Sequence, residues 1–298
     1  MEKRQFGKTD MRVSVLGFGG AEIGFERAPI EVVNRLLASA LDAGLNVIDT
    51  AECYLASEEL IGEAVSGRRN DFYLFTKCGH PEQPGVGDWR PESLLGTITR
   101  SLTRLNTDRV DLIHLHSCSE EELRKGDVIA ALQKAREKGY TRYIGYSGDG
   151  RAARYAVVCG AFDSLQTSVN IADQEAIEMT LPLARESQMG VIAKRPIANA
   201  AWRYDQAPAV EYHRPYWERL RTLDYDFLKG EPQQAVSIAL RFTLSIPGVH
   251  TAIVGTKNPK RWHENADLLN AGPLPERQIE SIRARWRAVA TPAWTGQT

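Results

Sequence analysis

The stretch Leu45-Asn46-Val47-Ile48-Asp49-Thr50-Ala51-Glu52-Cys53-Tyr54 begins one copy of a strand–loop–helix unit that repeats along the chain. Its first four residues have the mostly apolar, β-branched character of a short buried strand. Polar residues follow at once. Residues 57–65 then show the apolar spacing of a helix, with Ser57 suited to its N-cap. The stretch therefore predicts a strand, a polar loop and a helix, in that order.

The same order of strand, loop and helix recurs along the rest of the chain. The expected strands lie at residues 15–19, 45–48, 72–75, 109–115, 142–146, 164–167, 191–194 and 251–254. The expected helices lie at residues 29–43, 57–65, 90–105, 120–138, 152–159, 177–187, 233–244, 259–269 and 275–288. This alternation indicates a parallel sheet whose strands are joined by helices, and eight strands suggest that the sheet closes into a barrel.

An open, doubly wound sheet is the structural alternative for this rhythm. Its usual fingerprint is Gly-x-Gly-x-x-Gly at the start of a helix, and Gly17-Phe18-Gly19-Gly20 lacks the third glycine. We therefore predict a (β/α)8 TIM barrel in a single domain over residues 1–298. A β-hairpin of residues 3–6 and 12–15 is expected to cap the barrel, and the last two helices are expected to close it.

Residues 199–231 are the long stretch in which we find no regular period. A long loop in a compact domain is usually functional or acts as a lid, and we expect one of these roles here. The stretch is rich in aromatic side chains, which are Trp202, Tyr204, Tyr212, Tyr216 and Trp217.

The composition limits the class of protein. Hydrophobic residues make up 43% of the 298 residues and charged residues 25%, which favours a large core over disorder. The net charge of −1 provides no global field for nucleic acid or an anionic membrane, so neither is an expected partner. No run approaches the ~18 apolar residues of a membrane helix, and residues 1–6 are too polar for the core of a signal peptide.

The four cysteines show no Cys-x-x-Cys spacing, which disfavours a disulfide framework and a cysteine-rich zinc site. We expect reduced thiols in a cytoplasmic protein. No histidine pair has His-x-x-x-His or Glu-x-x-His spacing, so no metal site is expected. The cysteines are Cys53, Cys78, Cys118 and Cys159.

Candidate catalytic side chains follow adjacent strands of the expected barrel. Asp49 and Tyr54 follow the second strand, Lys77 ends the third, and an imidazole ends the fourth. Active sites of such barrels lie at the carboxyl ends of the strands, where these groups can meet. The set suits reduction of a carbonyl, because the alkoxide formed by hydride addition needs a proton.

Each residue type has a reason in this chemistry. A phenol with its ordinary pKa of about 10 holds its proton tightly, and a nearby ammonium such as that of Lys77 is expected to lower that pKa. The carboxylate of Asp49 would keep the lysine charged and fixed. An imidazole can donate a hydrogen bond to the carbonyl oxygen. His114 and His116 alternate on one strand and point to the same face, so either can supply it.

The order Asp49-x-x-x-x-Tyr54, Thr76-Lys77 and Asp111-Leu112-x-x-x-His116 resembles the aldo-keto reductase family, and the resemblance covers nearly the whole chain. It implies that Tyr54 is the general acid, that Lys77 tunes it and that Asp49 holds Lys77. The family places its histidine five residues after the aspartate, which selects His116 to orient the carbonyl. His114 is then expected to be a hydrogen-bonded core residue. A surface position is the default for the remaining histidines, His80, His213, His250 and His263.

The resemblance also implies a nicotinamide cofactor, with NADP(H) favoured over NAD(H). Residues 253–265 end the last strand and open a helix whose start, with Lys257 and Arg261, suits a phosphate. Ser147 and Gln166 match positions that hold the carboxamide, and residues 191–200 match the segment around the pyrophosphate. The expected cofactor-binding residues are Gly19, Gly20, Ser147, Gln166, Lys194, Pro196, Ile197, Gly255, Thr256, Lys257, Arg261, Glu264 and Asn265.

Several positions depart from the family pattern. Gly148 replaces an asparagine, Lys194 stands where many members stack an aromatic ring on the nicotinamide, and Gly255-Thr256 stands where Lys-Ser is common. Lys194 or Arg195 could contact phosphate or substrate, or form a structural salt bridge. These departures keep a cofactor-binding redox sensor or partner subunit, like potassium-channel β subunits, as the alternative function.

The expected partner is a small-molecule carbonyl substrate. Trp89, Trp202 and Trp217 lie in loops after strands, where they could form an apolar wall for it. A barrel enzyme of another class, such as an isomerase or a phosphate-ester enzyme, would need a different acid–base arrangement.

Overall fold

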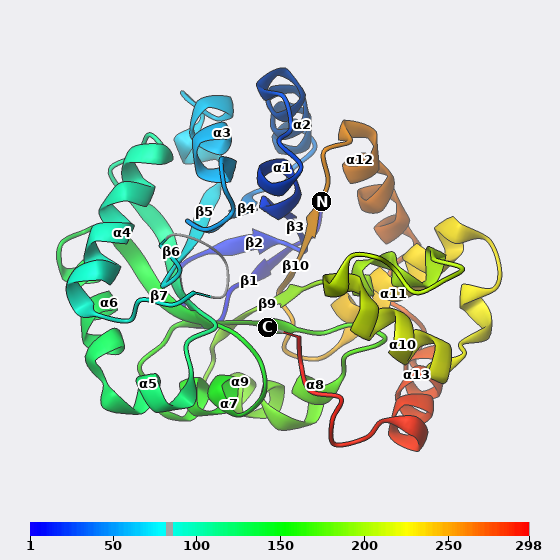
Figure 1. Ribbon diagram of the computed structural model, residues 1–298. Coiled ribbons are helices and arrows are strands. Elements are labelled where there is room, and N and C mark those ends of the chain that lie inside the picture. Colours follow the sequence, from blue (N-terminus) through cyan, green and yellow to red (C-terminus); the bar gives the residue numbers. More distant parts are fainter. Residues whose placement is uncertain (82–85, 298) are drawn as a thin grey trace.

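The computed structural model describes residues 1–81 and 86–297, and eight parallel strands in it form a closed barrel. The strands follow one another around the ring in the order β10-β3-β4-β5-β6-β7-β8-β9, and helices surround them (Figure 1). The predicted (β/α)8 barrel is confirmed, and the open sheet is excluded because β10 pairs with both β3 and β9. The barrel strands are β3 (Leu16–Gly19), β4 (Val47–Asp49), β5 (Tyr73–Cys78), β6 (Val110–His116), β7 (Thr141–Ser147), β8 (Ser164–Ser168), β9 (Gly190–Lys194) and β10 (Thr251–Gly255).

The expected hairpin precedes the barrel. Strands β1 (Lys3–Gln5) and β2 (Arg12–Ser14) pair in antiparallel fashion, with Lys3 opposite Ser14. Apolar side chains around the hairpin pack against side chains from inside the barrel, so the hairpin plugs one end of the ring. This cluster consists of Phe6, Met11, Val13, Val47, Phe75, Leu112 and Ile192.

The helices lie outside the sheet and bury their apolar faces against it. They are α1 (Ala21–Phe25), α2 (Ile30–Asp42), α3 (Ser57–Ala64), α4 (Pro91–Arg104), α5 (Glu120–Lys125), α6 (Asp127–Glu137), α7 (Gly150–Val158), α8 (Glu175–Met179), α9 (Leu181–Glu186), α10 (Arg214–Leu223), α11 (Pro232–Ser245), α12 (Pro259–Leu268) and α13 (Glu276–Val289). In α2, for example, Val33, Leu36, Leu37 and Ala40 are fully or almost fully buried. None of the helices within the described ranges has the length and apolar character needed to cross a membrane.

Two expected helices are each divided in the structure. Residues 120–138 break at Gly126, whose φ of 85° lies in the left-handed region that glycine tolerates best. Residues 177–187 fall into α8 and α9, which meet at Thr180, and Pro182 occupies the first turn of α9. A proline suits that position because it lacks an N–H group to donate.

The expectation of an irregular stretch at residues 199–231 is wrong in part. It contains the ten-residue helix α10, flanked by short 3-10 turns at Ala198–Arg203, Glu211–His213 and Asp226–Leu228. Tyr216, Leu220 and Leu223 lie on one face of α10 and are buried. The spacing of these three residues is helical, but the abundance of aromatic side chains around it obscured the pattern.

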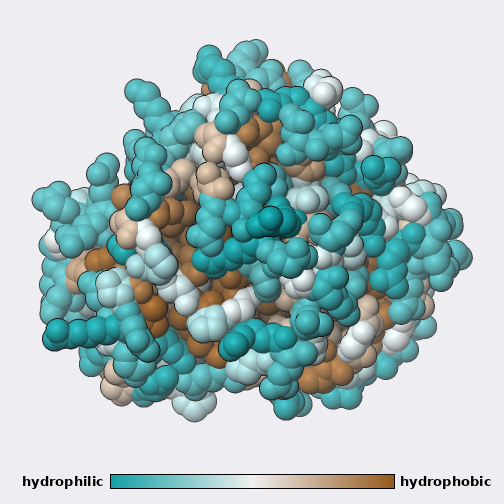
Figure 2. Space-filling view, turned by 180° about the vertical axis from the view of Figure 1, so that it is seen from behind, coloured by the Kyte–Doolittle hydropathy of each residue, from teal (hydrophilic) through white to brown (hydrophobic). Residues whose placement is uncertain are grey.

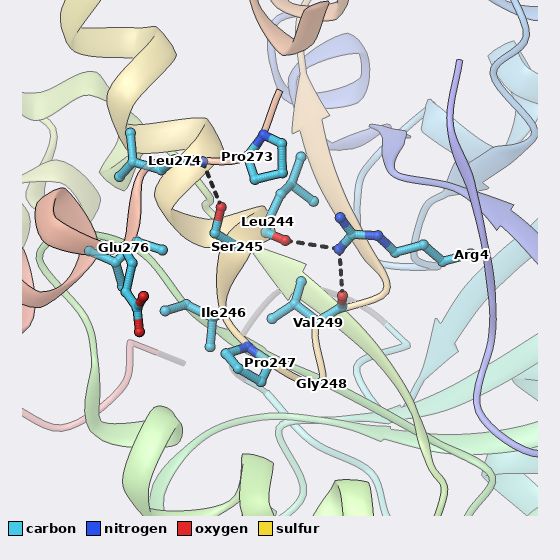
Figure 3. Close-up of a pocket in the computed structure, with 11 residues that line it drawn as sticks. Arg4, Leu244, Ser245, Ile246, Pro247, Gly248, Val249, Pro273, Leu274 and Glu276 are labelled. Atoms are coloured by element: carbon cyan, nitrogen blue, oxygen red, sulfur yellow. Dashed lines mark hydrogen bonds between the residues drawn. The ribbon is translucent and has the colours of Figure 1, made fainter. Parts of the chain in front are cut away.

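The hairpin is tied to the chain that leads into β10. Arg4 Nη1 donates hydrogen bonds of 2.9 Å to the carbonyl oxygens of Leu244 and Val249. These residues line a hollow of about 380 Å³ (Figure 3). It lies at the amino end of β10, away from the carboxyl ends where the candidate catalytic residues lie.

Seen from behind, hydrophilic side chains dominate the surface, and hydrophobic ones show mainly in hollows between them (Figure 2).

Candidate active site

Four predicted catalytic residues come from three adjacent strands and one loop. Asp49 ends β4, Lys77 is the fifth residue of β5, His116 ends β6, and Tyr54 lies in the loop between β4 and α3. Because β4, β5 and β6 are neighbours in the barrel, their carboxyl ends place these side chains together.

An ion pair lies at the centre of this group. Lys77 Nζ is 2.6 Å from Asp49 Oδ1 and donates a second hydrogen bond of 2.8 Å to the carbonyl oxygen of Thr50. The lysine nitrogen is 4.9 Å from the centre of the Tyr54 ring. The Tyr54 and His116 rings meet edge to face, with their centres 5.8 Å apart. A phenol, an ammonium, a carboxylate and an imidazole therefore converge at one end of the barrel.

Burial controls the protonation of these groups. It raises the pKa of the Tyr54 phenol well above its ordinary value, and the charge of Asp49 adds to the effect. This direction is opposite to the lowering we expect from Lys77. Desolvation of the phenolate is the largest cause of the rise, and the positive charge of Arg195 opposes it. Burial also lowers the pKa of His116 well below its ordinary value, and the positive charge of Lys77 lowers it further. At neutral pH the phenol therefore keeps its proton, and the imidazole is uncharged.

The predicted carboxamide-binding residues are linked to the ion pair, which the sequence did not indicate. Ser147 Oγ donates a 2.8 Å hydrogen bond to Gln166 Oε1, and Gln166 Nε2 donates one of 3.1 Å to Asp49 Oδ2. Burial raises the pKa of Asp49, while its contacts with Lys77 and Gln166 oppose that rise. Both carboxylate oxygens of Asp49 are thus held, one by Lys77 and the other by Gln166.

His80 is buried beside the site, so the surface position assumed for it is wrong. Only 6% of the residue is exposed, and its Nε2 donates a 2.6 Å hydrogen bond to the carbonyl oxygen of His116. The ring also contacts the edges of the Trp89 and His116 rings, with centres 5.4 and 5.3 Å away. Trp89, expected in a substrate wall, therefore reaches the site through His80, whose ring contacts that of His116. A histidine in a loop directly after a strand end was the available signal for His80.

His114 has the core position expected for it. It is fully buried, and its Nε2 lies 3.2 Å from Ser164 Oγ. The other two candidate wall residues follow β9. Trp202 lies in the 3-10 turn Ala198–Arg203, and Trp217 lies on the helix α10 rather than in a loop. Trp217 Nε1 donates a 2.9 Å hydrogen bond to the carbonyl oxygen of Tyr204, and Trp202 packs partly buried against the core. The structure thus places Trp89 against His80 beside the candidate site, whereas Trp217 packs onto its own segment.

Glu52 is a buried acid that binds the backbone of the loop containing His80, and the sequence alone did not indicate this role. Its Oε1 accepts a 2.6 Å hydrogen bond from the backbone N–H of His80, and its Oε2 has no hydrogen-bond partner among the described residues. Burial raises the pKa of Glu52 to about 7, while the backbone N–H groups of His80 and Gly79 oppose the rise.

This raised pKa predicts a pH-dependent stability. The folded chain favours the protonated Glu52, so its contribution is complete below the ordinary pKa of 4.5 and is lost as pH rises through about 7. Glu52→Gln should match wild-type stability near pH 4.5 and exceed it by about 3 kcal/mol above pH 8, at ~1.36 kcal/mol per pKa unit. Urea unfolding across this pH range measures the difference. The exposed Glu63→Gln is the control, and an equal gain in both variants would contradict the assignment to Glu52.

The predicted phosphate-binding segment forms the turn after β10 and the start of α12. Asn258 caps this helix, its Oδ1 accepting a 3.0 Å hydrogen bond from the N–H of Lys260. The two basic side chains predicted to bind the phosphate are exposed and paired with acids: Lys257 with Glu26 at 2.5 Å, and Arg261 with Glu264 at 3.0 Å. Glu264 thus serves as the partner of Arg261. Of the other predicted positions here, Asn265 is buried, and Thr256 Oγ1 accepts from the N–H of Asn258 at 3.0 Å.

The glycines expected near the cofactor allow close approaches. Gly20 N donates a 2.7 Å hydrogen bond to the carbonyl oxygen of Asp49, and a Cβ at Gly20 would lie 2.6 Å from Ser57 Oγ. The carboxylate of Glu22 lies where a Cβ of Gly255 would be, while Gly19 pairs with Gly255 in the barrel. The glycines at the ends of β3 and β10 therefore leave room for the neighbouring α1 helix.

The carboxyl end of β9 is covered by the C-terminal segment, which the sequence did not indicate. Lys194 forms an ion pair of 2.7 Å with Asp149 and donates to the carbonyl oxygen of Gln297 at 3.1 Å. Arg195 donates to the same oxygen and also lies over the Tyr212 ring. Figure 1 shows the chain from α13 ending near β9. Lys194 therefore forms the salt bridge named as one alternative, and its contact with a cofactor or substrate stays a prediction.

The predicted residues Pro196 and Ile197 continue the chain beyond β9. The Pro196 carbonyl oxygen accepts a 2.9 Å hydrogen bond from Thr243 Oγ1 of α11, which anchors this turn. Ile197 is partly buried against the core.

Within residues 1–81 and 86–297, no cluster of three or more His, Cys, Asp or Glu side chains is arranged to hold a metal ion.

Comparison with known proteins places this geometry in a family. The model of the aldo/keto reductase family matches residues 15–287. An uncharacterized oxidoreductase of Bacillus subtilis (strain 168) is 28% identical over 95% of this chain and 96% of its own, and the L-galactose dehydrogenase of Arabidopsis thaliana is 26% identical over 99% and 97%. The solved holo form of an aldo-keto reductase from Bacillus halodurans is 26% identical, covers 98% of both chains and has a TM-score of 0.84. The chain belongs to the aldo/keto reductase family.

Proposed function

We propose that this protein reduces an aldehyde or ketone to an alcohol with NADPH, and that Tyr54 donates the proton. The observation that carries the proposal is the buried Lys77–Asp49 pair, 2.6 Å long, beside the Tyr54 ring. Burying two charges at a strand end is costly, so a site of this kind is more typical of function than of stability. Membership of an oxidoreductase family that acts on small carbonyl compounds supports the same reading.

The proton transfer follows from the protonation states of the side chains. Tyr54 keeps its phenolic proton at neutral pH, because burial raises its pKa. When the carbonyl carbon is reduced, its oxygen becomes the stronger base and takes that proton from Tyr54 Oη. Lys77 Nζ, 4.9 Å from the ring centre, then stabilises the phenolate, and Asp49 holds Lys77 in place.

His116 is assigned the second contact with the carbonyl oxygen. The imidazole is neutral, so it donates a hydrogen bond without transferring a full charge. Its edge-to-face contact with Tyr54 puts the two donors on one side of the site. Together they fix the oxygen and so orient the carbonyl carbon for hydride transfer.

The residues at the other strand ends fit a nicotinamide cofactor. Ser147 and Gln166 form a buried polar pair that suits the carboxamide, and Asn170 Nδ2 is a buried donor with no partner among the described residues. The basic start of α12 suits the adenosine phosphate. NADPH, when bound, supplies the hydride. The chain itself orients the carbonyl through His116 and supplies the proton from Tyr54.

The proposal is tested by cofactor binding followed by turnover. NADPH and NADH are titrated into the protein while its tryptophan fluorescence is recorded. NADPH oxidation is then followed with a panel of small aldehydes and ketones. We expect NADPH binding and measurable turnover of at least one carbonyl. Failure to bind either cofactor would contradict the proposed function as a whole.

The preference for NADPH is expected to depend on Lys257. Lys257→Met should raise the Kd for NADPH about tenfold and leave that for NADH unchanged, because only NADPH carries the 2′-phosphate. Glu26→Gln provides the matched opposite change. It frees Lys257 from a carboxylate at 2.5 Å and should tighten NADPH binding. Equal changes for both cofactors would show that Lys257 does not contact this phosphate.

A cofactor-binding redox sensor or partner subunit is the second candidate. Gly148 has no side chain to bind the carboxamide, and Lys194 is held by Asp149 and Gln297 where many family members have an aromatic ring. Both features weaken the packing around the nicotinamide. Tight NADPH binding without turnover of any carbonyl in the panel would favour this candidate.

A further inference from the structure

Cys53 contacts the imidazole that the proposed mechanism uses. Its Sγ lies 3.6 Å from His116 Nδ1, within the range for a hydrogen bond that involves sulfur. The residue is 4% exposed, directly precedes Tyr54 and forms no disulfide. Among the described residues, the His116 ring makes no other side-chain hydrogen bond, so its Nε2 stays free for a substrate oxygen.

The backbone of His116 is fixed separately. His80 Nε2 donates to the His116 carbonyl oxygen at 2.6 Å, and Glu52 holds the His80 backbone at 2.6 Å. The peptide that carries the ring is therefore held by Glu52 through His80. The orientation and tautomer of the ring itself depend on what Nδ1 meets, which is Cys53.

A neutral imidazole carries one N–H group, and its position decides whether His116 can assist. If Nδ1 carries the proton, it donates to Cys53 Sγ, and Nε2 can only accept. A carbonyl oxygen also only accepts, so it would then find no donor. If Cys53 donates its S–H to Nδ1, the proton lies on Nε2, which can polarise the carbonyl.

The state of the Cys53 thiol fits the second arrangement. Burial raises the pKa of Cys53 to about 12, so the sulfur keeps its proton at neutral pH and can donate it. A thiolate would instead accept from Nδ1–H and lock the imidazole in the wrong tautomer. The protonated thiol of Cys53, 3.6 Å from His116 Nδ1, can therefore supply the donor that the mechanism needs there.

We propose that Cys53 is a positioning residue that donates its S–H to His116 Nδ1 and thereby holds the proton on Nε2, facing the substrate carbonyl. This inference rests on the proposed reductase function for its kinetic consequence only. The tautomer itself is a property of the folded protein without substrate. Cys53 does not touch the reacting atoms, and its effect passes through His116.

The tautomer is measured directly in protein labelled with ¹⁵N-histidine. Long-range ¹H–¹⁵N correlation distinguishes protonated from bare ring nitrogens, and His116→Gln assigns the signals. We expect Nε2 to be protonated and Nδ1 bare in the wild type. Cys53→Val, which removes the S–H and leaves an apolar side chain, should show a mixture of tautomers. Cys53→Ser should restore the wild-type pattern. A wild-type His116 protonated on Nδ1, or an unchanged tautomer in Cys53→Val, would overturn the proposal.

Kinetics add a second readout. Cys53→Val should lower kcat by roughly 3- to 10-fold, the effect of losing one hydrogen bond, with the Kd for NADPH unchanged. Cys53→Ser should recover most of this loss. Cys118→Ala is the matched control, because Cys118 is also buried and close to His116 in sequence but its thiol faces the Ser119 carbonyl oxygen. An equal loss in Cys118→Ala would overturn the specific role of Cys53. Thermal unfolding confirms that each variant is folded.

Discussion

Tyr54→Phe is expected to lower kcat for carbonyl reduction by roughly 10³-fold, because general acid catalysis contributes about 10²–10⁴-fold and the ring has no other proton to give. The raised pKa of the phenol makes the effect independent of pH over the neutral range, since Tyr54 stays protonated throughout. The Kd for NADPH should stay within a factor of about two, because the phenol is assigned to the substrate carbonyl. Stopped-flow measurement of a single turnover separates the chemical step from product release.

The control for this variant is Tyr155→Phe. Tyr155 lies on α7 outside the barrel, where its ring packs against the Arg124 guanidinium at 4.4 Å, and its hydroxyl has no role in the proposed chemistry. It should retain wild-type kcat. Tyr54→Phe with more than a tenth of the wild-type rate in single turnover would exclude Tyr54 as the proton donor.

Lys77→Met is expected to have the largest combined effect on activity and stability. Removing the ammonium leaves Asp49 as a buried carboxylate with Gln166 as its remaining side-chain partner, which typically costs about 3–5 kcal/mol of unfolding free energy. The rate should also fall by roughly 10²-fold or more, because no positive charge stabilises the Tyr54 phenolate. Urea unfolding and single-turnover kinetics measure the two effects separately.

The double variant Lys77→Met with Asp49→Asn separates the two roles of the pair. It removes both charges, so it should regain much of the lost stability, while the rate stays as low as in Lys77→Met. The side-chain amide introduced by Asp49→Asn can still accept a hydrogen bond from Gln166. Recovery of activity together with stability would mean that Lys77 acts only by supporting the fold.

The sequence was sufficient to predict the barrel, because its signals are local and repeat. A strand such as Val47–Asp49 shows in its apolar run and a helix such as Ile30–Asp42 in its 3.6-residue spacing, and their alternation determines a parallel sheet. The meeting of Asp49 and Lys77 was also predictable. Adjacent parallel strands end at the same edge, so residues at consecutive strand ends must lie close together.

Local sequence signals predicted helix boundaries less reliably where a single residue determines the backbone conformation. A single glycine, Gly126, divides one expected helix, and Pro182 opens a new helix inside another. In α10 the helical face of Tyr216, Leu220 and Leu223 was present in the sequence, but it lay in a segment rich in turns and aromatic residues. Tertiary packing against the core stabilises this helix beyond what its own spacing indicated.

The sequence by itself thus determined the strand order and which residues stand at the strand ends. The tertiary structure alone decided how those residues are connected: Gln166 to Asp49, Cys53 to His116, and Gln297 to Lys194 across 103 residues of chain. These contacts join loops and termini that have no fixed spacing in the sequence. They depend on side-chain packing and on the burial that shifts each pKa, and both arise only when the barrel has closed.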